Sequence, residues 1–171
     1  SGLFTALAEW STKKTNSLRQ EKEVRSWRPD LLIPVTMPKD LRSSFKLIHS
    51  IIYPKGSAKI LALRDENMTE QKNMERFLKN AVKKFKESDL SVSYSVIDNS
   101  DFNTTVNVSM QSLNAAFFKP NIIFSSIDPA TSNLSYYDKL ITDTKRNNFG
   151  MIIYIPYSTA SLAIEKNINL W

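Results

Sequence analysis

The sequence predicts a three-layer α/β domain built on a mostly parallel sheet of five strands. Short apolar runs alternate with amphipathic helical segments along the chain, and the connections between them are brief. Such alternation places parallel strands in one sheet with helices on both of its faces. A hydrophobic content of 42% and a charged content of 23% are ordinary for a globular chain of 171 residues.

The first predicted strand lies within residues 26–37, where an apolar run follows a charged, Trp-containing approach. A short run between turn signals is typical of a strand that is buried on both faces. The first helix is predicted over residues 41–53 with Asp40 as its N-cap, because apolar residues recur there at spacings of three and four. A Pro and a Gly then end it before a second strand over residues 58–63.

The second helix has the clearest pattern, because apolar residues recur between Met74 and Phe85 at helical spacing while lysines fill the other positions. Burial of that apolar stripe would make this helix part of the core. Asn67 or Thr69 is its predicted cap. No aromatic residue interleaves with the lysines, so we expect a solvated face rather than a nucleic-acid surface.

The later elements continue the same alternation. Residues 91–97 alternate Val and Tyr with Ser, which predicts a less buried strand near a sheet edge. The remaining predicted elements are a helix that starts at Asp101 or Asn103 and ends before Pro120, a strand over 121–127, a helix over 134–147 and a strand over 151–157.

Residues 1–25 are predicted to be an amphipathic linker helix and connector in front of the α/β domain of residues 26–171. The helix has a short apolar stripe, followed by basic residues, and the stripe consists of Leu3, Phe4, Leu7 and Trp10. It could pack on its own domain, or serve as a juxtamembrane linker that rests on anionic headgroups or a neighbouring domain. We expect weak packing on the domain and a role as connector or dimer contact.

Composition weighs against catalysis and metal binding. The chain has no Cys and one His, His49, so it cannot build a Cys/His metal cluster or a Cys-His pair. It has no nucleophile elbow, no dinucleotide fingerprint and no Walker A motif. Four Asp residues follow predicted strands, where helix capping explains them better than ligand binding: Asp65, Asp98, Asp101 and Asp128. We expect no enzyme activity, no catalytic residue, no cofactor and no metal.

The net charge of +6 is compatible with an anionic membrane surface, with nucleic acid or with neither. No apolar run is long enough to span a bilayer. Charge alone therefore identifies no partner.

Four short motifs resemble the cytoplasmic C-terminal domain of cation–chloride cotransporters, which belong to the amino acid–polyamine–organocation transporter superfamily. Trp-Arg-Pro at residues 27–29 is similar to the motif that leads from the family's linker helix into its first strand. Residues 121–124 look like the strand before a Gly-Trp-Pro turn, although Ser-Ser-Ile stands at 125–127 instead. Residues 150–157 resemble the next strand, and residues 167–171 resemble the segment that opens the second half of that domain.

The resemblance implies a domain of two halves, each like a universal stress protein with strand order 3-2-1-4-5. This chain would be the first half. The implied role is non-catalytic: a regulatory and assembly domain at the cytoplasmic face of the cell membrane that tunes coupled transport of sodium or potassium with chloride. Some bacterial relatives carry amino acids instead. The implied partners are the membrane domain of the same polypeptide, a second copy of the chain and the membrane surface, with no nucleic acid.

A nucleotide-binding module is the alternative, because universal stress proteins bind ATP at the ends of strands one, two and four. Thr36, Arg64, Ser125 and Ser126 would be the contacting residues here. The glycine-rich signature after strand four is missing, since Asp-Pro-Ala-Thr stands at residues 128–131. Phosphates need close backbone approach, which glycine permits, so we expect no tight ATP binding.

Overall fold

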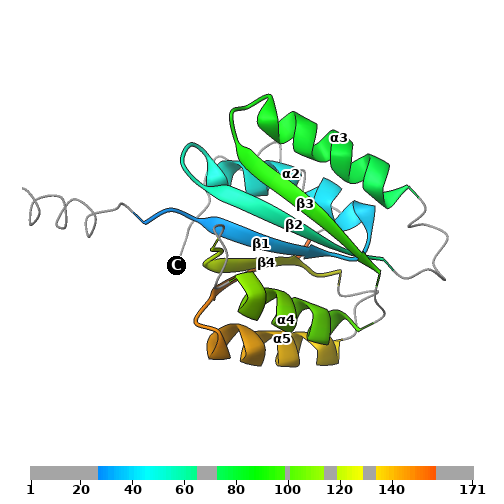
Figure 1. Ribbon diagram of the computed structural model, residues 1–171, viewed down its shortest axis with the longest axis vertical. Coiled ribbons are helices and arrows are strands. Elements are labelled where there is room, and N and C mark those ends of the chain that lie inside the picture. The colour runs from blue at the N-terminus through cyan, green and yellow to red at the C-terminus, as the bar shows by residue number, and fades with distance from the viewer. Residues whose placement is uncertain (1–26, 65–72, 99–100, 114–118, 129–133, 157–171) are drawn as a thin grey trace, which may run out of the picture.

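The computed structural model describes residues 27–64, 73–98, 101–113, 119–128 and 134–156 (Figure 1). Five strands form one sheet in the order β3-β2-β1-β4-β5, and every pairing in it is parallel. Both the α/β class and the strand order agree with the prediction. The elements are β1 (Asp30–Val35), α2 (Pro38–Ile52), β2 (Ser57–Arg64), α3 (Met74–Lys86), β3 (Ser91–Asp98), α4 (Phe102–Leu113), β4 (Ile122–Ser126), α5 (Leu134–Arg146) and β5 (Gly150–Tyr154).

Several predictions fall on residues outside these ranges. They are the linker helix of residues 1–25, the cap at Asp65, and the segment at residues 167–171. The caps predicted at Asn67 and Thr69 are wrong, because α3 begins at Met74 and its N-cap is Asn73.

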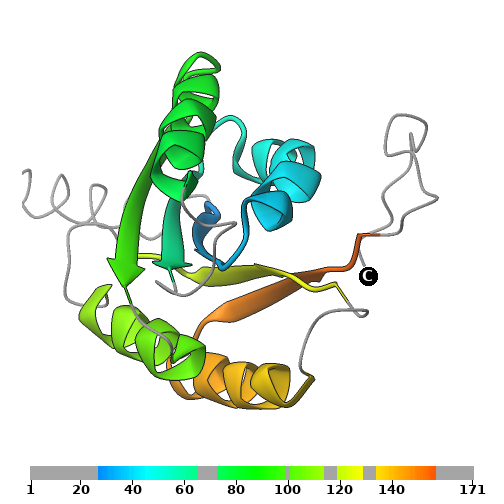
Figure 2. The same cartoon turned by 90° about the vertical axis from the view of Figure 1, so that its right-hand side faces the viewer.

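The molecule has three layers, with helices on both faces of the sheet. Helices α2 and α3 cover one face, and α4 and α5 cover the other (Figures 1 and 2). Each helix follows a strand and returns across the sheet, because parallel strands must all start at the same end. The strands therefore finish, and the described helices begin, at what we call the carboxyl end. The helices finish and the strands begin at the amino end.

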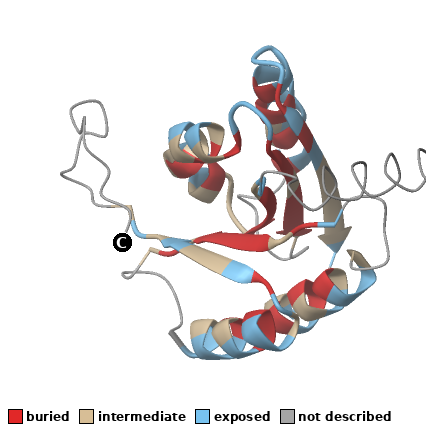
Figure 3. Cartoon of the chain, turned by 90° about the vertical axis from the view of Figure 1, so that its left-hand side faces the viewer, coloured by how far each residue is buried: buried red, intermediate tan, exposed pale blue. Residues whose placement is uncertain are grey.

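Strand β1 is the centre of the core. All six of its residues are buried, as predicted for a strand covered on both faces (Figure 3). Its side chains alternate between the two layers, because successive residues of a strand point to opposite faces. Leu31, Ile33 and Val35 pack into the cluster beneath α2 and α3. Leu32 packs on the other face, in the cluster beneath α4 and α5.

Helix α3 buries the apolar stripe that the sequence predicts. Met74, Leu78 and Phe85 are fully buried, and the Phe85 ring stacks on Phe45 of α2 with centroids 4.2 Å apart. The lysines of α3 lie on its exposed face. This ring contact joins the two helices that cover the first face of the sheet.

The start of α2 differs from the prediction. The helix begins at Pro38 rather than Leu41, because Pro suits the first helical position and its missing N–H costs nothing there. Asp40 is therefore not the N-cap but the third helical residue. Its carboxylate reaches back and accepts the Met37 N–H at 3.2 Å, so it still satisfies a free amide at the helix start.

Helix α4 starts as predicted. Asp101 precedes it, and its carboxylate accepts the Thr104 N–H at 3.1 Å and the Thr104 hydroxyl at 2.7 Å. These hydrogen bonds lower the pKa of Asp101, because they stabilise its charged form.

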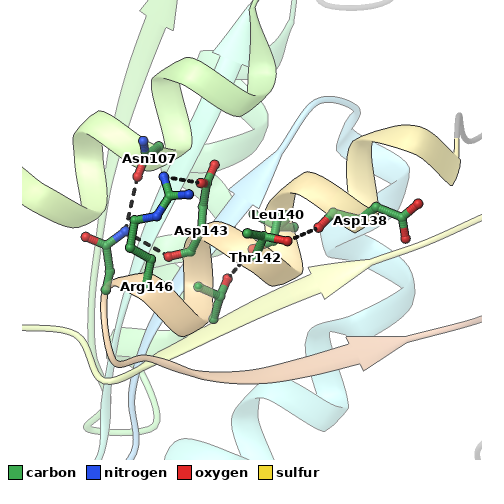
Figure 4. A network of polar contacts seen from close by, with 8 residues as sticks. Asn107, Asp138, Leu140, Thr142, Asp143 and Arg146 are labelled. Carbon is green, nitrogen blue, oxygen red and sulfur yellow. Dashed lines mark hydrogen bonds and ion pairs between the residues drawn. The ribbon is translucent and has the colours of Figure 1, made fainter.

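The last turns of α5 are tied to α4 by polar contacts (Figure 4). Asn147 donates to the Asn107 side chain at 3.1 Å and to the Asp143 carbonyl at 2.8 Å. Asp143 is buried and pairs with Arg146 at 3.5 Å. Leu140, on the turn before Asp143, is buried as well, so the inner face of α5 carries a charged residue beside an apolar one.

Candidate functional site

Ligands of open α/β sheets bind at the carboxyl end, where neighbouring connections leave to opposite faces. Here that point lies between β1 and β4, since α2 covers one face and α5 the other (Figure 2). Thr36 directly follows β1, and Ser126 is the last residue of β4. The fold therefore brings these two predicted nucleotide contacts to the same end of adjacent strands. Ser125 directly precedes Ser126 in sequence but is buried within β4.

A carboxyl group already occupies the start of α2 at this point. Asp40 Oδ2 accepts from the Met37 N–H, and the Thr36 hydroxyl lies 3.5 Å from the same oxygen. Burial is the largest influence and raises the pKa of Asp40, and the contacts with Met37, Lys39 and Thr36 oppose that rise. Because folding raises this pKa, ionisation of Asp40 opposes folding. The loss of stability is complete above the raised pKa, shrinks as the pH falls, and is gone below the ordinary value of 3.8.

The loop after β4 adds a second acid. Asp128 pairs with Lys39 at 3.5 Å, and it also raises the pKa of Asp40 through like-charge repulsion. An incoming phosphate would thus meet two carboxyl groups at the start of α2, with the nearby Lys39 already paired. The prediction that Asp128 caps a helix falls on a connection that the structure does not describe in full.

Arg64 and Asp98 form a pair of their own at the ends of β2 and β3. The guanidinium donates to both carboxylate oxygens of Asp98, at 2.6 and 3.1 Å, and the two residues are register partners. These hydrogen bonds are the main reason that the pKa of Asp98 is lowered. The prediction that Asp98 caps a helix is wrong, because Asp98 is the last residue of β3 and Asp101 makes the capping hydrogen bonds at the start of α4.

Neither a metal site nor a membrane span appears among the residues that the structure describes. No group of three or more His, Cys, Asp or Glu side chains is placed to hold an ion. None of the described helices is long and apolar enough to cross a bilayer. His49 lies half-buried on the surface of α2, and its ring stacks on Tyr53.

The amino end carries a polar clamp around the Trp-Arg-Pro motif. Asn121, which precedes β4, accepts the Asp30 N–H at 2.9 Å and donates to the Arg28 carbonyl at 2.8 Å. Asp30 also pairs with the Arg28 guanidinium at 3.0 Å and accepts the Ser57 hydroxyl. We call Arg28, Asp30, Ser57 and Asn121 the entry clamp. It fixes the chain where it enters the central strand.

Gly56 completes the clamp from the side of β2. The Pro29 carbonyl accepts the Ser57 N–H at 3.1 Å, which brings the backbone of the motif against the turn before β2. A Cβ atom on Gly56 would lie 2.4 Å from the Pro29 oxygen and 2.9 Å from the Ile52 Cα. Only Gly allows the backbones to approach this closely.

Sequence reasoning missed the entry clamp apart from the motif itself. Asp30 and Asn121 stand 91 residues apart, and only the adjacency of β1 and β4 brings them together. A polar residue directly before a buried apolar strand, as at Asn121, is the local signal that was available. An open depression of about 410 Å³ lies beside the clamp, lined by Lys119, Pro120, Asn121, Asn147, Asn148 and Phe149.

The fold is a parallel α/β domain. Ion pairs lie at the described part of its carboxyl end, and the entry clamp lies at its amino end. Comparison with known proteins agrees with this class. The family profile "Prokaryotic cation-chloride cotransporter, C-terminal domain, 1st" matches residues 33–162. The chain belongs to this family. Among curated proteins, none matches the chain.

Two solved structures match this chain. The cytoplasmic domain of a prokaryotic cation chloride cotransporter is 26% identical, with a TM-score of 0.66, over 78% of this chain and 48% of that chain. This chain thus spans about half the length of that structure. A universal stress family protein from Burkholderia pseudomallei is 8% identical, with a TM-score of 0.46, over 75% of this chain and 96% of its own.

Proposed function

We propose that this chain is the first half of a non-catalytic domain at the cytoplasmic face of the cell membrane, where it tunes an ion-coupled transporter and helps to assemble its dimer. The observation that carries the proposal is the entry clamp in a chain of the cation-chloride cotransporter family. The proposed partners are the membrane domain of the same polypeptide and a second copy of the chain. Ions, and amino acids in some relatives, would bind in the membrane domain.

The clamp supports tuning because it joins the incoming chain to the most buried strand of the sheet. Asn121, directly before β4, binds the backbone of Arg28 and Asp30, and Ser57 of β2 binds the Asp30 carboxylate. The start of β1 is therefore held from both sides of the sheet. A displacement of the connector would therefore move the sheet as a body rather than bend a loose terminus.

We expect Asn121→Ala in the full-length transporter to retain transport but to change its rate by about fivefold or more, the lower range of typical allosteric coupling. The substitution removes the hydrogen bond to the Arg28 carbonyl and leaves the Asp30 N–H without its acceptor. Ion flux into vesicles that contain the purified transporter, at a temperature where the domain stays folded, is the measurement. Asn80→Ala is the matched control, since Asn80 is exposed on α3. Equal flux in the wild type and both variants would contradict the tuning role.

We also expect no tight ATP binding at Thr36, Arg64, Ser125 and Ser126. Arg64 is engaged by Asp98, Ser125 is buried, and Asp40 and Asp128 place acids where phosphates would lie. Calorimetric titration of the 171-residue chain with MgATP is the measurement. A dissociation constant at or below about a micromolar, equivalent to roughly −8 kcal/mol, would favour the nucleotide-binding module instead.

A further inference from the structure

The amino end concentrates exposed cations. It comprises the loops that precede the strands and the last turns of the described helices (Figure 1). Eight basic residues lie there, all exposed: Arg28, Lys55, Lys83, Lys84, Lys86, Lys119, Lys145 and Arg146. Four carboxylates lie at the same end: Asp30, Glu87, Asp89 and Asp143. Asp30 and Asp143 are buried in the pairs with Arg28 and Arg146, so the exposed surface of this end is strongly basic.

Most of these cations form no ion pair within the described part of the chain. Only Arg28 and Arg146 form ion pairs, and the other six have none with any residue that the structure describes. Basic residues in a last helical turn are ordinary, because they complement the helix dipole. Lys55 and Lys119 lie in loops, however, and that explanation does not cover them.

At the carboxyl end, acidic residues outnumber basic residues. Its described strand ends and first helical turns hold five carboxylates, Asp40, Glu75, Asp98, Asp101 and Asp128, against three cations, Lys39, Arg64 and Arg76. Lys39 and Arg64 are already paired with Asp128 and Asp98. The described domain is therefore polarised along the strand direction, with its basic pole where the chain enters β1.

Two large aromatic side chains stand exposed at the basic pole. Trp27 is 71% exposed at the start of the motif, and Tyr53 is 61% exposed at the end of α2. The Tyr53 ring is supported on one side by His49, with parallel rings 5.9 Å apart. Exposed Trp and Tyr beside lysines are typical of surfaces that sit at the headgroup level of a bilayer.

We propose that the amino end rests on the anionic phospholipid headgroups of the membrane from which the chain descends, with Trp27 and Tyr53 in the headgroup layer. The proposal rests on the proposed function, because it requires a membrane part before Trp27. The entry clamp fixes which end of the domain would face the membrane, because the chain enters β1 at the same end as the basic pole. Attraction to headgroups falls off within about 10 Å at 0.1 M salt, so the surfaces must be in close contact.

The first test is co-sedimentation of the 171-residue chain with vesicles. We expect binding to phosphatidylcholine vesicles that contain phosphatidylglycerol, weakening as salt rises, and little binding to pure phosphatidylcholine. Lys55→Glu with Lys119→Glu should lower the affinity by about tenfold or more, because each cation near an anionic surface contributes severalfold. Arg76→Glu with Lys79→Glu is the control. It makes the same change in net charge at exposed positions of α3 away from the amino end.

The second test uses Trp27 as a probe. With Trp10→Phe and Trp171→Phe, Trp27 is the single tryptophan, and its emission should shift to the blue when anionic vesicles are added. An unshifted emission, no binding to anionic vesicles, or equal loss in both double variants would overturn the proposal. So would self-association that the Lys55 and Lys119 changes abolish, because the acidic end of a second copy would then be the partner. None of these outcomes would alter the flux effect of Asn121→Ala, which tests the proposed function separately.

Discussion

Replacing Phe85 by Ala is expected to lower the free energy of unfolding by about 3–5 kcal/mol, the usual range for removing a fully buried aromatic ring. Phe85 is 0% exposed and stacks on Phe45, so its loss opens a cavity between α2 and α3. Its backbone carbonyl also accepts the Leu90 N–H, which limits how far the helix end can move to fill that space. Urea denaturation followed by circular dichroism is the measurement.

Phe77→Ala is the matched control on the same helix. Phe77 is only half-buried, and its ring lies beneath the Arg42 guanidinium at 5.5 Å. Phe77 packs against the edge of the core cluster beneath α2 and α3. Because it buries less apolar area than Phe85, its replacement should lower the free energy of unfolding by about 2 kcal/mol or less. If the two variants lost the same stability, Phe85 would not be the centre of that packing.

Gly56→Ala is expected to lower the free energy of unfolding by about 1–3 kcal/mol, the usual cost of forcing an extra methyl group into a close-packed contact. The added methyl group would meet the Pro29 carbonyl and the Ile52 backbone, and none of those atoms is the end of a flexible side chain. The turn would have to move, and the hydrogen bond from Ser57 to Pro29 would move with it. The loss should appear both in thermal unfolding and as faster amide exchange at Ser57.

Gly150→Ala separates this conflict from any general effect of replacing a glycine. A Cβ atom at Gly150 would meet Ile122 Cγ1 at 3.4 Å and the Asn121 carbonyl at 3.7 Å, which are acceptable contacts. Its stability should stay within about 1 kcal/mol of the wild type, and it could rise because Ala restricts the unfolded chain. A larger loss at Gly150 than at Gly56 would show that the close approach to Pro29 is not the cause.

The elements that depend on local pattern could be predicted well. The burial of β1, the apolar stripe of α3 and the position of β3 at the sheet edge all follow from the spacing of apolar residues. Helix starts were less secure. Helix α2 begins one turn earlier than predicted, at Pro38, so Asp40 is the third helical residue and not the N-cap, although its carboxylate still accepts the Met37 N–H.

The contacts between distant residues could not be predicted in the same way. Arg64 meets Asp98 only because β2 and β3 pair in one particular register. Asn121 reaches the motif only because β4 lies beside β1. The basic pole is invisible in the linear sequence, since its cations come from five separate loops and helix ends. A resemblance to a known family could supply the strand order, but not these pairings.

The position of β1 has a mechanical consequence. A pull on the chain at Trp27 is directed along the strand that lies between β2 and β4. To yield, β1 would have to slide past both neighbours at once and break two ladders together, whereas β3 or β5 could be peeled away from a single neighbour. Force applied at Trp27 therefore meets the stiffest direction of the sheet. Under the proposed function, a pull from the membrane domain would move the sheet as a rigid body instead of unravelling it.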